Sequence, residues 1–186
     1  DELSVLLRKK QEIMEQLHSL MPLMTVMYID LCSSTRHFYE RGDHDGYELV
    51  NFFQDLCLRT IRSWKPAFVN QRGGDQILSG FAEPSICVDA AVSVLTTLDE
   101  NGWQIKQKIY DGVPFGISLG IHRGRLILKD GAPSTCHTLL LAEQLQKRAS
   151  TNQILVSHAV FSELVGEPKL RARKHGILEI SDVPEP

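Results

Sequence analysis

The sequence lacks the features that mark membrane-spanning, disulfide-rich and nucleic-acid-binding proteins. No apolar run approaches the roughly 20 residues of a membrane span. The net charge is −3, which leaves no strongly basic surface for nucleic acid or anionic lipid. Cysteine is sparse, and Cys32, Cys57, Cys87 and Cys136 show no paired zinc spacing. Without a secretory context these cysteines are expected to be reduced thiols, which predicts a cytoplasmic protein.

Motifs of several enzyme classes are also missing. Gly73–Gly74 is not followed by the Lys and Ser/Thr of a phosphate-binding P-loop. Ser33 and Ser34 have no nearby His/Asp pattern that would make either of them a nucleophile. What the chain does have is size, because 186 residues with 42% apolar content are enough for one domain to bury its own core.

Helical and strand patterns alternate along the chain. We expect helices near residues 1–21, 47–61, 84–98, 135–149 and 159–165, and strands at 23–29, 67–69, 76–81, 113–122, 125–128, 153–156 and 177–180. A polar loop is expected to lead from the first strand to the second helix, and Asn101–Gly102 to end the third. Hairpins are expected around Gly73–Gly74 and Arg123–Gly124. The pattern therefore predicts an α+β fold with a mixed, mainly antiparallel sheet and helices packed outside it.

The first 22 residues have a heptad pattern. Leu6, Ile13 and Leu20 lie seven residues apart, Leu3 and Leu17 occupy the companion position, and Lys10 interrupts the stripe. This spacing favours a short seam between two helices. The alternative is an amphipathic helix folded onto its own domain. We expect residues 1–22 to form a signalling or dimerisation helix and residues 23–186 to form the domain.

Two aspartates stand beside apolar segments. Asp30 follows the apolar run 24–29, and Asp75 follows Gly73–Gly74 and opens the segment 76–81. A carboxylate at the end of a strand, next to a loop of small residues, offers a divalent cation a hard oxygen ligand and leaves room for a phosphate. Two such sites could hold the same pair of ions, as in-line phosphoryl chemistry requires. The alternative is that each Asp only caps a turn.

Four segments together carry a family resemblance. They are Asp30-Leu-Cys-Ser-Ser-Thr35, Gly73-Gly-Asp75-Gln-Ile-Leu-Ser-Gly-Phe81, Gly120-Ile-His-Arg-Gly124 and Gln153-Ile-Leu-Val-Ser157. In this order, from about residue 24 to residue 165, they resemble the class III adenylate/guanylate cyclase catalytic domain. The resemblance implies a ferredoxin-like sheet with helices outside. It also implies head-to-tail pairing of two domains, with the active sites at the dimer interface.

The resemblance implies roles for particular residues. Asp30 and Asp75 would be the catalytic aspartates that bind two Mg²⁺ or Mn²⁺ ions, with the backbone carbonyl of Leu31 as a further ligand. The triphosphate would be held by the backbone amides of Cys32, Ser33, Ser34 and Thr35. A nucleoside triphosphate would become a 3′,5′-cyclic nucleotide and pyrophosphate.

Four positions that complete the site in this family are changed. The two base-reading positions carry Gln71 and His137, the ribose-orienting Asn is Leu140, and the phosphate-stabilising Arg is Gln144. Gln and His can still hydrogen-bond a base, but Leu cannot hydrogen-bond a ribose and Gln carries no charge. Losing one such stabilising donor typically costs about 3–4 kcal/mol in the transition state. Lys147 and Arg148 either return a cation to this place or are solvated surface charges.

Three hypotheses follow from these matches and departures. The chain is an active homodimeric cyclase whose substrate is open among ATP, GTP and the pyrimidine triphosphates. Alternatively, it is the metal-bearing half of a heterodimer whose partner completes the site. A third hypothesis is a catalytically degenerate module that regulates through dimerisation. Nucleic acid and membrane insertion of this segment are not expected for any of them. In a binding module outside the family, Asp30 and Asp75 should lie far apart.

Overall fold

The computed structural model describes residues 2–108 and 116–166. Within them, a five-stranded sheet has the order β2-β3-β1-β4-β7. Its strands are β1 (Leu23–Leu31), β2 (Phe68–Arg72), β3 (Gln76–Phe81), β4 (Ile117–Arg125) and β7 (Gln153–Val156). β7 runs parallel to β4, and the other neighbours are antiparallel. The expected α+β fold with a mixed, mainly antiparallel sheet is therefore confirmed.

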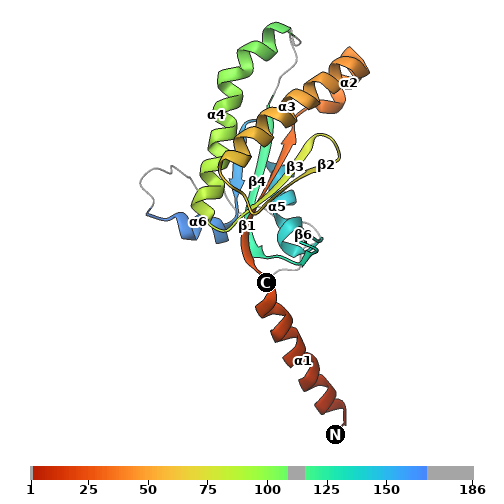
Figure 1. Cartoon of the computed structure of the whole chain (residues 1–186), viewed down its shortest axis with the longest axis vertical. Coiled ribbons are helices and arrows are strands. Elements are labelled where there is room, and N and C mark those ends of the chain that lie inside the picture. The colour runs from red at the N-terminus through yellow and green to blue at the C-terminus, as the bar shows by residue number, and fades with distance from the viewer. Residues whose placement is uncertain (1, 109–115, 167–186) are drawn as a thin grey trace.

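Helices cover both faces of this sheet (Figure 1). The helices of the described residues are α1 (Glu2–Leu20), which lies apart from the sheet, α2 (Ser34–Arg41), α3 (Asp43–Ser63), α4 (Pro84–Lys108), α5 (His137–Arg148) and α6 (His158–Leu164). Two short strands, β5 (Leu128–Lys129) and β6 (Ala132–Pro133), pair with each other between β4 and α5. No helix in the described ranges combines the length and apolar character that a bilayer crossing requires. All four cysteines lie in these ranges and are free.

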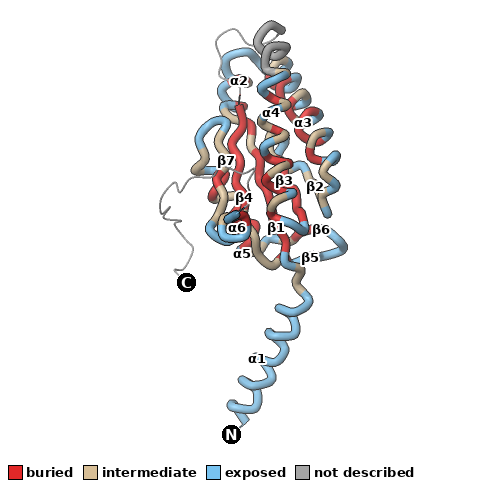
Figure 2. Tube along the Cα trace, turned by 90° about the vertical axis from the view of Figure 1, so that its left-hand side faces the viewer, coloured by how far each residue is buried: buried red, intermediate tan, exposed pale blue. Residues whose placement is uncertain are grey.

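The alternation of side chains along the strands divides the core in two, because successive residues of a strand point to opposite faces. Met27, Ile29 and Leu31 of β1 pack in one cluster with the apolar sides of α3, α4 and α6. Met24, Val26 and Tyr28 pack on the other face, in a smaller cluster with Leu139 and Ala142 of α5. We call these the α3 face and the α5 face. Figure 2 shows the buried strands between the helices.

β1 is the strand that positions the candidate site. It is paired along its length with β3 on one side and β4 on the other. The strand continues to Leu31, two residues further than expected, so Asp30 is a strand residue and not the first residue of a loop. Its partners across the sheet are Gln76 on β3 and Ser118 on β4. By strand alternation, Asp30 belongs to the α5 face together with Tyr28.

The prediction of a loop between the first strand and the second helix is wrong, because most of these residues form α2. Ser34 and His37 of this helix are buried. The ring of Phe38 lies so close to Gly46 of α3 that a methyl group there would overlap it. The two helices therefore pack closely, with Gly42 in a left-handed conformation between them (φ 87°).

The hairpin expected around Arg123–Gly124 is also wrong. β4 runs straight through these residues, and Gly124 pairs with Met24 of β1. Gly124 is needed there because any side chain would overlap Thr138 of α5. A turn and the β5–β6 pair follow instead of a strand at 125–128.

The third expected helix is longer than predicted, because α4 continues through Asn101–Gly102 to Lys108. The Asn101 side chain donates a hydrogen bond to the backbone carbonyl of Thr97 at 2.7 Å. Asn101 therefore supports the helix at this position and does not end it. The expected strand at 177–180 and the start of the strand at 113–115 lie outside the described residues.

α1 extends away from the domain as a single exposed helix (Figures 1 and 2). None of its residues is buried. Leu6 is 58% exposed and Ile13 is 55% exposed. The alternative that this helix folds onto its own domain is therefore wrong. An apolar stripe of this length in water favours association with another helix, and the heptad spacing favours a second copy.

We expect the helix to strengthen dimerisation. A Leu6→Ala/Ile13→Ala variant, and a chain that begins at Leu23, should dissociate at lower protein concentration than the full chain in sedimentation experiments. Gln11→Ala/Glu15→Ala is the matched control, since it removes an exposed side-chain hydrogen bond of the same helix and leaves the stripe intact. Equal dissociation constants for all of these proteins would show that α1 does not contribute to self-association.

Candidate carboxylate site on the alpha5 face

Asp30 lies among polar side chains from several elements. Gln76 and Ser118 flank it on the neighbouring strands. Gln146 of α5 lies above the same strands, is 3% exposed and donates from Nε2 to the Ser118 hydroxyl at 2.7 Å. Hydrogen bonding from the side chains of Gln76 and Gln146 favours the ionised form of Asp30. The carboxylate is therefore held by neutral donors, with no direct ion pair to an Arg or Lys among the described residues.

Asp75 is held at the bend between β2 and β3. Its backbone carbonyl accepts a hydrogen bond from the amide of Leu31 at 3.1 Å, which fixes the bend against the end of β1. Its carboxylate accepts a second hydrogen bond, at 2.6 Å, from the hydroxyl of Ser34 at the start of α2. Gly73 and Gly74 both have positive φ, of 60° and 91°, so the bend needs glycine at these positions.

The two carboxylates are close enough to interact electrostatically. The pKa of Asp30 is raised to about 6, first by burial and second by the negative charge of Asp75. Hydrogen bonding from Gln76 and Gln146 and the positive charge of Lys147 work in the opposite direction. The structure thus brings Asp30 and Asp75 close together. In a binding module outside the cyclase family they would be expected to lie far apart.

The oxygen ligands at this site fit a Mg²⁺ or Mn²⁺ ion for which the protein supplies only some of the ligands. No group of three or more His, Cys, Asp or Glu side chains that could hold a metal occurs in residues 2–108 and 116–166. Mg²⁺ is usually bound by one or two carboxylates together with substrate phosphates and water, not by a complete protein cage. Two neighbouring carboxylates suit such an ion, because a cation between them offsets the repulsion of their negative charges.

The loop after β1 has the geometry of an anion site, with one exception. Ser33 has a left-handed backbone (φ 64°, ψ 21°) directly before the first helical residue of α2, so successive amides turn toward a common point. The amide of Cys32 is already bonded to the carbonyl of Gly116 at 2.9 Å. Of the four amides expected to hold a triphosphate, those of Ser33, Ser34 and Thr35 are therefore the better placed.

Three of the four changed positions lie on one side of α5. His137, Leu140 and Gln144 follow helical spacing, and Leu140 is 45% exposed, whereas Leu139, Ala142 and Leu145 face the core. The fourth changed position, Gln71, lies away from these three residues. It pairs with Ile77 of the α3 face, and its amide donates to Gln54 of α3 at 3.1 Å.

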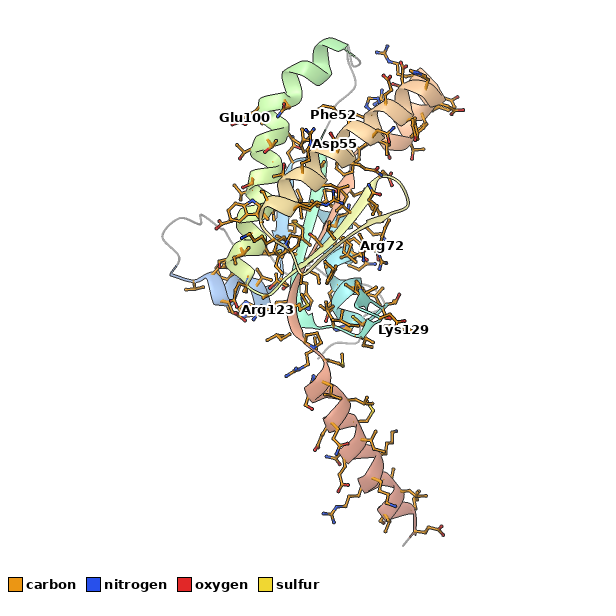
Figure 3. The ribbon with its side chains drawn as sticks, viewed as in Figure 1. Phe52, Asp55, Arg72, Glu100, Arg123 and Lys129 are labelled. Atoms are coloured by element: carbon orange, nitrogen blue, oxygen red, sulfur yellow. The ribbon has the colours of Figure 1, made fainter. Side chains whose placement is uncertain are left out.

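The neighbouring residue, Arg72, lies on the α5 side of the β2–β3 hairpin instead (Figure 3). Its guanidinium is 6.0 Å from the centre of the Tyr28 ring, in a cation–π contact. Nothing in the sequence alone distinguishes residue 71 from residue 72, because the face depends on how the strand is paired.

The guanidinium of Arg148 lies beside Gln144. Arg148 donates to the side-chain carbonyl of Gln144 at 2.6 Å and to its backbone carbonyl at 3.3 Å. The guanidinium of Arg148 is thus tied to the side chain that occupies the expected arginine position. Lys147 points elsewhere, to an ion pair with Glu143 at 2.6 Å.

The motifs Gly120–Gly124 and Gln153–Ser157 contact each other through a side-chain hydrogen bond. His122 of β4 shares a hydrogen bond of 2.8 Å with the hydroxyl of Ser157, which follows β7. Burial and, to a smaller extent, the nearby His137 lower the pKa of His122 to about 4. The histidine is therefore neutral at physiological pH, and its hydrogen bond joins β4 to the residue after β7.

A groove of about 730 Å³ lies on the other side of the molecule, between α3 and α4. Arg59, Trp64 and Thr97 are among its lining residues, and neither Asp30, Asp75 nor α5 contributes to it. This groove is therefore separate from the carboxylate site, where Asp30 and Asp75 are both half-buried.

Solved structures of nucleotidyl cyclases share this arrangement of helices and strands. The adenylyl cyclase CyaB from P. aeruginosa is 17% identical, with a TM-score of 0.76 over 88% of this chain and 90% of that chain. An adenylate cyclase from Trypanosoma brucei, solved in its monomeric state, is 18% identical, with a TM-score of 0.71 over 88% and 86%. The chain has the fold of a class III cyclase catalytic domain.

A guanylate cyclase domain from Catenaria anguillulae, solved in complex with GTP, also matches this cyclase fold. It is 15% identical, with a TM-score of 0.62 over 78% of this chain and 84% of that one. No protein-family model and no curated protein sequence matches the chain. The cyclase fold is thus supported by three-dimensional likeness at low sequence identity.

The raised pKa of Asp30 predicts a pH-dependent cost to stability. Its folded-state pKa of about 6 exceeds the ordinary value of 3.8 for an aspartate, so ionisation of Asp30 destabilises the fold as the pH rises through this window. We expect Asp30→Asn to gain free energy of unfolding relative to the wild type between pH 4 and pH 6, measured by urea unfolding. Asp75→Asn should move the wild-type transition to lower pH. Parallel stability curves for wild type and Asp30→Asn would contradict this assignment.

Proposed function

We propose that this cyclase-like domain converts a nucleoside triphosphate to a 3′,5′-cyclic nucleotide and pyrophosphate at a dimer interface. The observation that carries the proposal is the meeting of Asp30 and Asp75, which are 45 residues apart in sequence and come together at one end of β1. Their closeness is costly unless a cation lies between them. The loop of Ser33–Thr35 beside them supplies amides for an anion, which suits a substrate with a polyphosphate.

The reaction needs few side chains for its chemistry. The 3′ oxygen of the ribose forms a bond with the α-phosphorus, the bond from that phosphorus to the β-bridging oxygen breaks, and the hydroxyl proton is released. Two bound Mg²⁺ or Mn²⁺ ions would favour loss of that proton and offset charge on the pyrophosphate. In this proposal Asp30, Asp75 and the Leu31 carbonyl hold the ions, and the amides of Ser33, Ser34 and Thr35 orient the phosphates.

The second domain of the proposed dimer would present its α5 to this site. His137 would lie toward the base and Leu140 toward the ribose, where it gives apolar contact in place of a hydrogen bond. Arg148 would supply the positive charge that Gln144 lacks, since its guanidinium is anchored on the Gln144 side chain. The site would then be complete in a homodimer without a different partner.

The first test is a nucleotide panel. We expect the purified protein, with Mn²⁺ or Mg²⁺ and each of ATP, GTP, CTP and UTP, to form one cyclic nucleotide and pyrophosphate, identified by mass spectrometry. Asp30→Ala and Asp75→Ala should each remove metal-dependent nucleotide binding while circular dichroism stays unchanged. Absence of turnover at high protein concentration would exclude the homodimeric enzyme. Turnover only after addition of a second cyclase subunit would indicate the half-site hypothesis instead.

Arg148 gives a second test, on the enzyme with the substrate found in the panel. We expect Arg148→Met to lower kcat about 100- to 1000-fold, as for loss of one charged transition-state donor. Adding Gln144→Arg to Arg148→Met should restore most of the activity, because it returns the charge to the same place. The control is Arg59→Met on α3, which removes an exposed ion pair with Asp55. A normal kcat for Arg148→Met would assign Arg148 to the solvated surface.

A further inference from the structure

The contact between α5 and β4 at Gly120 determines what lies over Asp30. A methyl group on Gly120 would overlap the backbone of both Ala142 and Gln146. Helix and strand are therefore in direct backbone contact, closer than any residue with a side chain would permit. This contact places the Gln146 side chain at the level of Ser118, two residues before Gly120 on the same face of β4.

Gln146 is an unusual residue to bury at this place. It is 3% exposed on the core side of α5, where its neighbours Leu139, Ala142 and Leu145 are apolar. Its Nε2 donates to Ser118 at 2.7 Å, but its Oε1 is buried and accepts no hydrogen bond from a described residue. An unsatisfied buried acceptor destabilises the fold, and an apolar pair of similar shape at 118 and 146 would avoid this cost.

The cost makes sense if the amide serves Asp30. Ser118 is the Cα partner of Asp30 across the β1–β4 ladder, and Gln76 is its partner across the β1–β3 ladder. The Gln146 amide, fixed by Ser118, hydrogen-bonds toward the same carboxylate. The carboxylate thus has neutral polar groups on both neighbouring strands and on the helix above, and the pair Gln146–Ser118 is the buried part of this enclosure.

We propose that Gln146, oriented by Ser118, is a positioning residue that holds the Asp30 carboxylate in the orientation required for metal binding. This inference rests on the proposed function, because it assigns to Asp30 the role of metal ligand. Neither Gln146 nor Ser118 contacts the metal or the reacting atoms in this proposal. Outer hydrogen-bond partners of this kind typically contribute about 10- to 100-fold to metal affinity or activity.

The experiment measures Mn²⁺ binding by the full chain, from the loss of the electron paramagnetic resonance signal of free aqueous Mn²⁺. The variants are Gln146→Met, which keeps the volume and removes the amide, Ser118→Ala, and the two combined. We expect about 10- to 100-fold weaker Mn²⁺ binding for Gln146→Met and a smaller loss for Ser118→Ala. The double variant should bind no more weakly than Gln146→Met, since the two residues act through one contact.

Thr138→Val is the matched control for the structural cost of the substitutions. Thr138 is also buried on α5, and its hydroxyl donates to the carbonyl of Arg125 at 2.7 Å, away from Asp30. It removes one buried side-chain hydrogen bond of α5, as Gln146→Met does, and should leave the Mn²⁺ affinity unchanged. A purely structural Gln146 would behave like this control.

The outcomes separate this inference from the proposed function. If the wild type binds Mn²⁺, Asp30→Ala does not, and Gln146→Met binds as the wild type does, the positioning role is overturned and the metal site stands. If the wild type itself binds no Mn²⁺, the metal site and the positioning role both fall. Should Gln146→Met not fold, Ser118→Ala decides, and an unchanged Mn²⁺ affinity in that variant overturns the role.

Discussion

The electrostatic repulsion between Asp30 and Asp75 is the constraint around which the rest of this site is arranged. Stability alone does not favour two carboxylates at the end of the central strand, since burial and the negative charge of Asp75 both disfavour the ionised form of Asp30. The neighbours moderate this cost without cancelling it. Ser34 donates to Asp75, and Gln76 and Gln146 donate toward Asp30, so both carboxylates are held by neutral donors.

The two faces of the sheet separate most of the hydrophobic burial from the carboxylate site. Most of the buried apolar residues lie on the α3 face, where α3, α4 and α6 cover the strands. The α5 face has a smaller apolar cluster and leaves the end of β1 to polar residues. The carboxylate site can therefore carry unfavourable charge because the opposite face supplies the greater part of the hydrophobic burial.

Local patterns were sufficient to predict the strands around the site, but not the contacts between them. β3 forms as predicted, and β1 starts as predicted, because each is an apolar segment bounded by turn residues. α2 was missed because its short sequence, Ser34–Arg41, is mostly polar, and it is held by packing of Phe38 against Gly46. The interruption expected in β4 was wrong because Gly124 serves close packing with Thr138, which no local pattern reveals. Ser118 and Gln146 went unnoticed for the same reason, since their link to Asp30 depends on strand register.

Strand register also changes what the substitutions in the cyclase pattern mean. A residue can read a nucleotide base only from the face of the sheet on which the nucleotide lies. Gln71 faces α3 and is bonded to Gln54, so in the proposed function, with the nucleotide on the α5 face, it would not read the base. Arg72, in contact with the Tyr28 ring, is the cation of this hairpin on the α5 face. Similarly, in the proposed function the charge that Gln144 lacks would come from Arg148, whose guanidinium is bonded to the Gln144 side chain. Of the departures from the family pattern, Leu140 alone therefore removes a polar group without a described neighbour on α5 that replaces it.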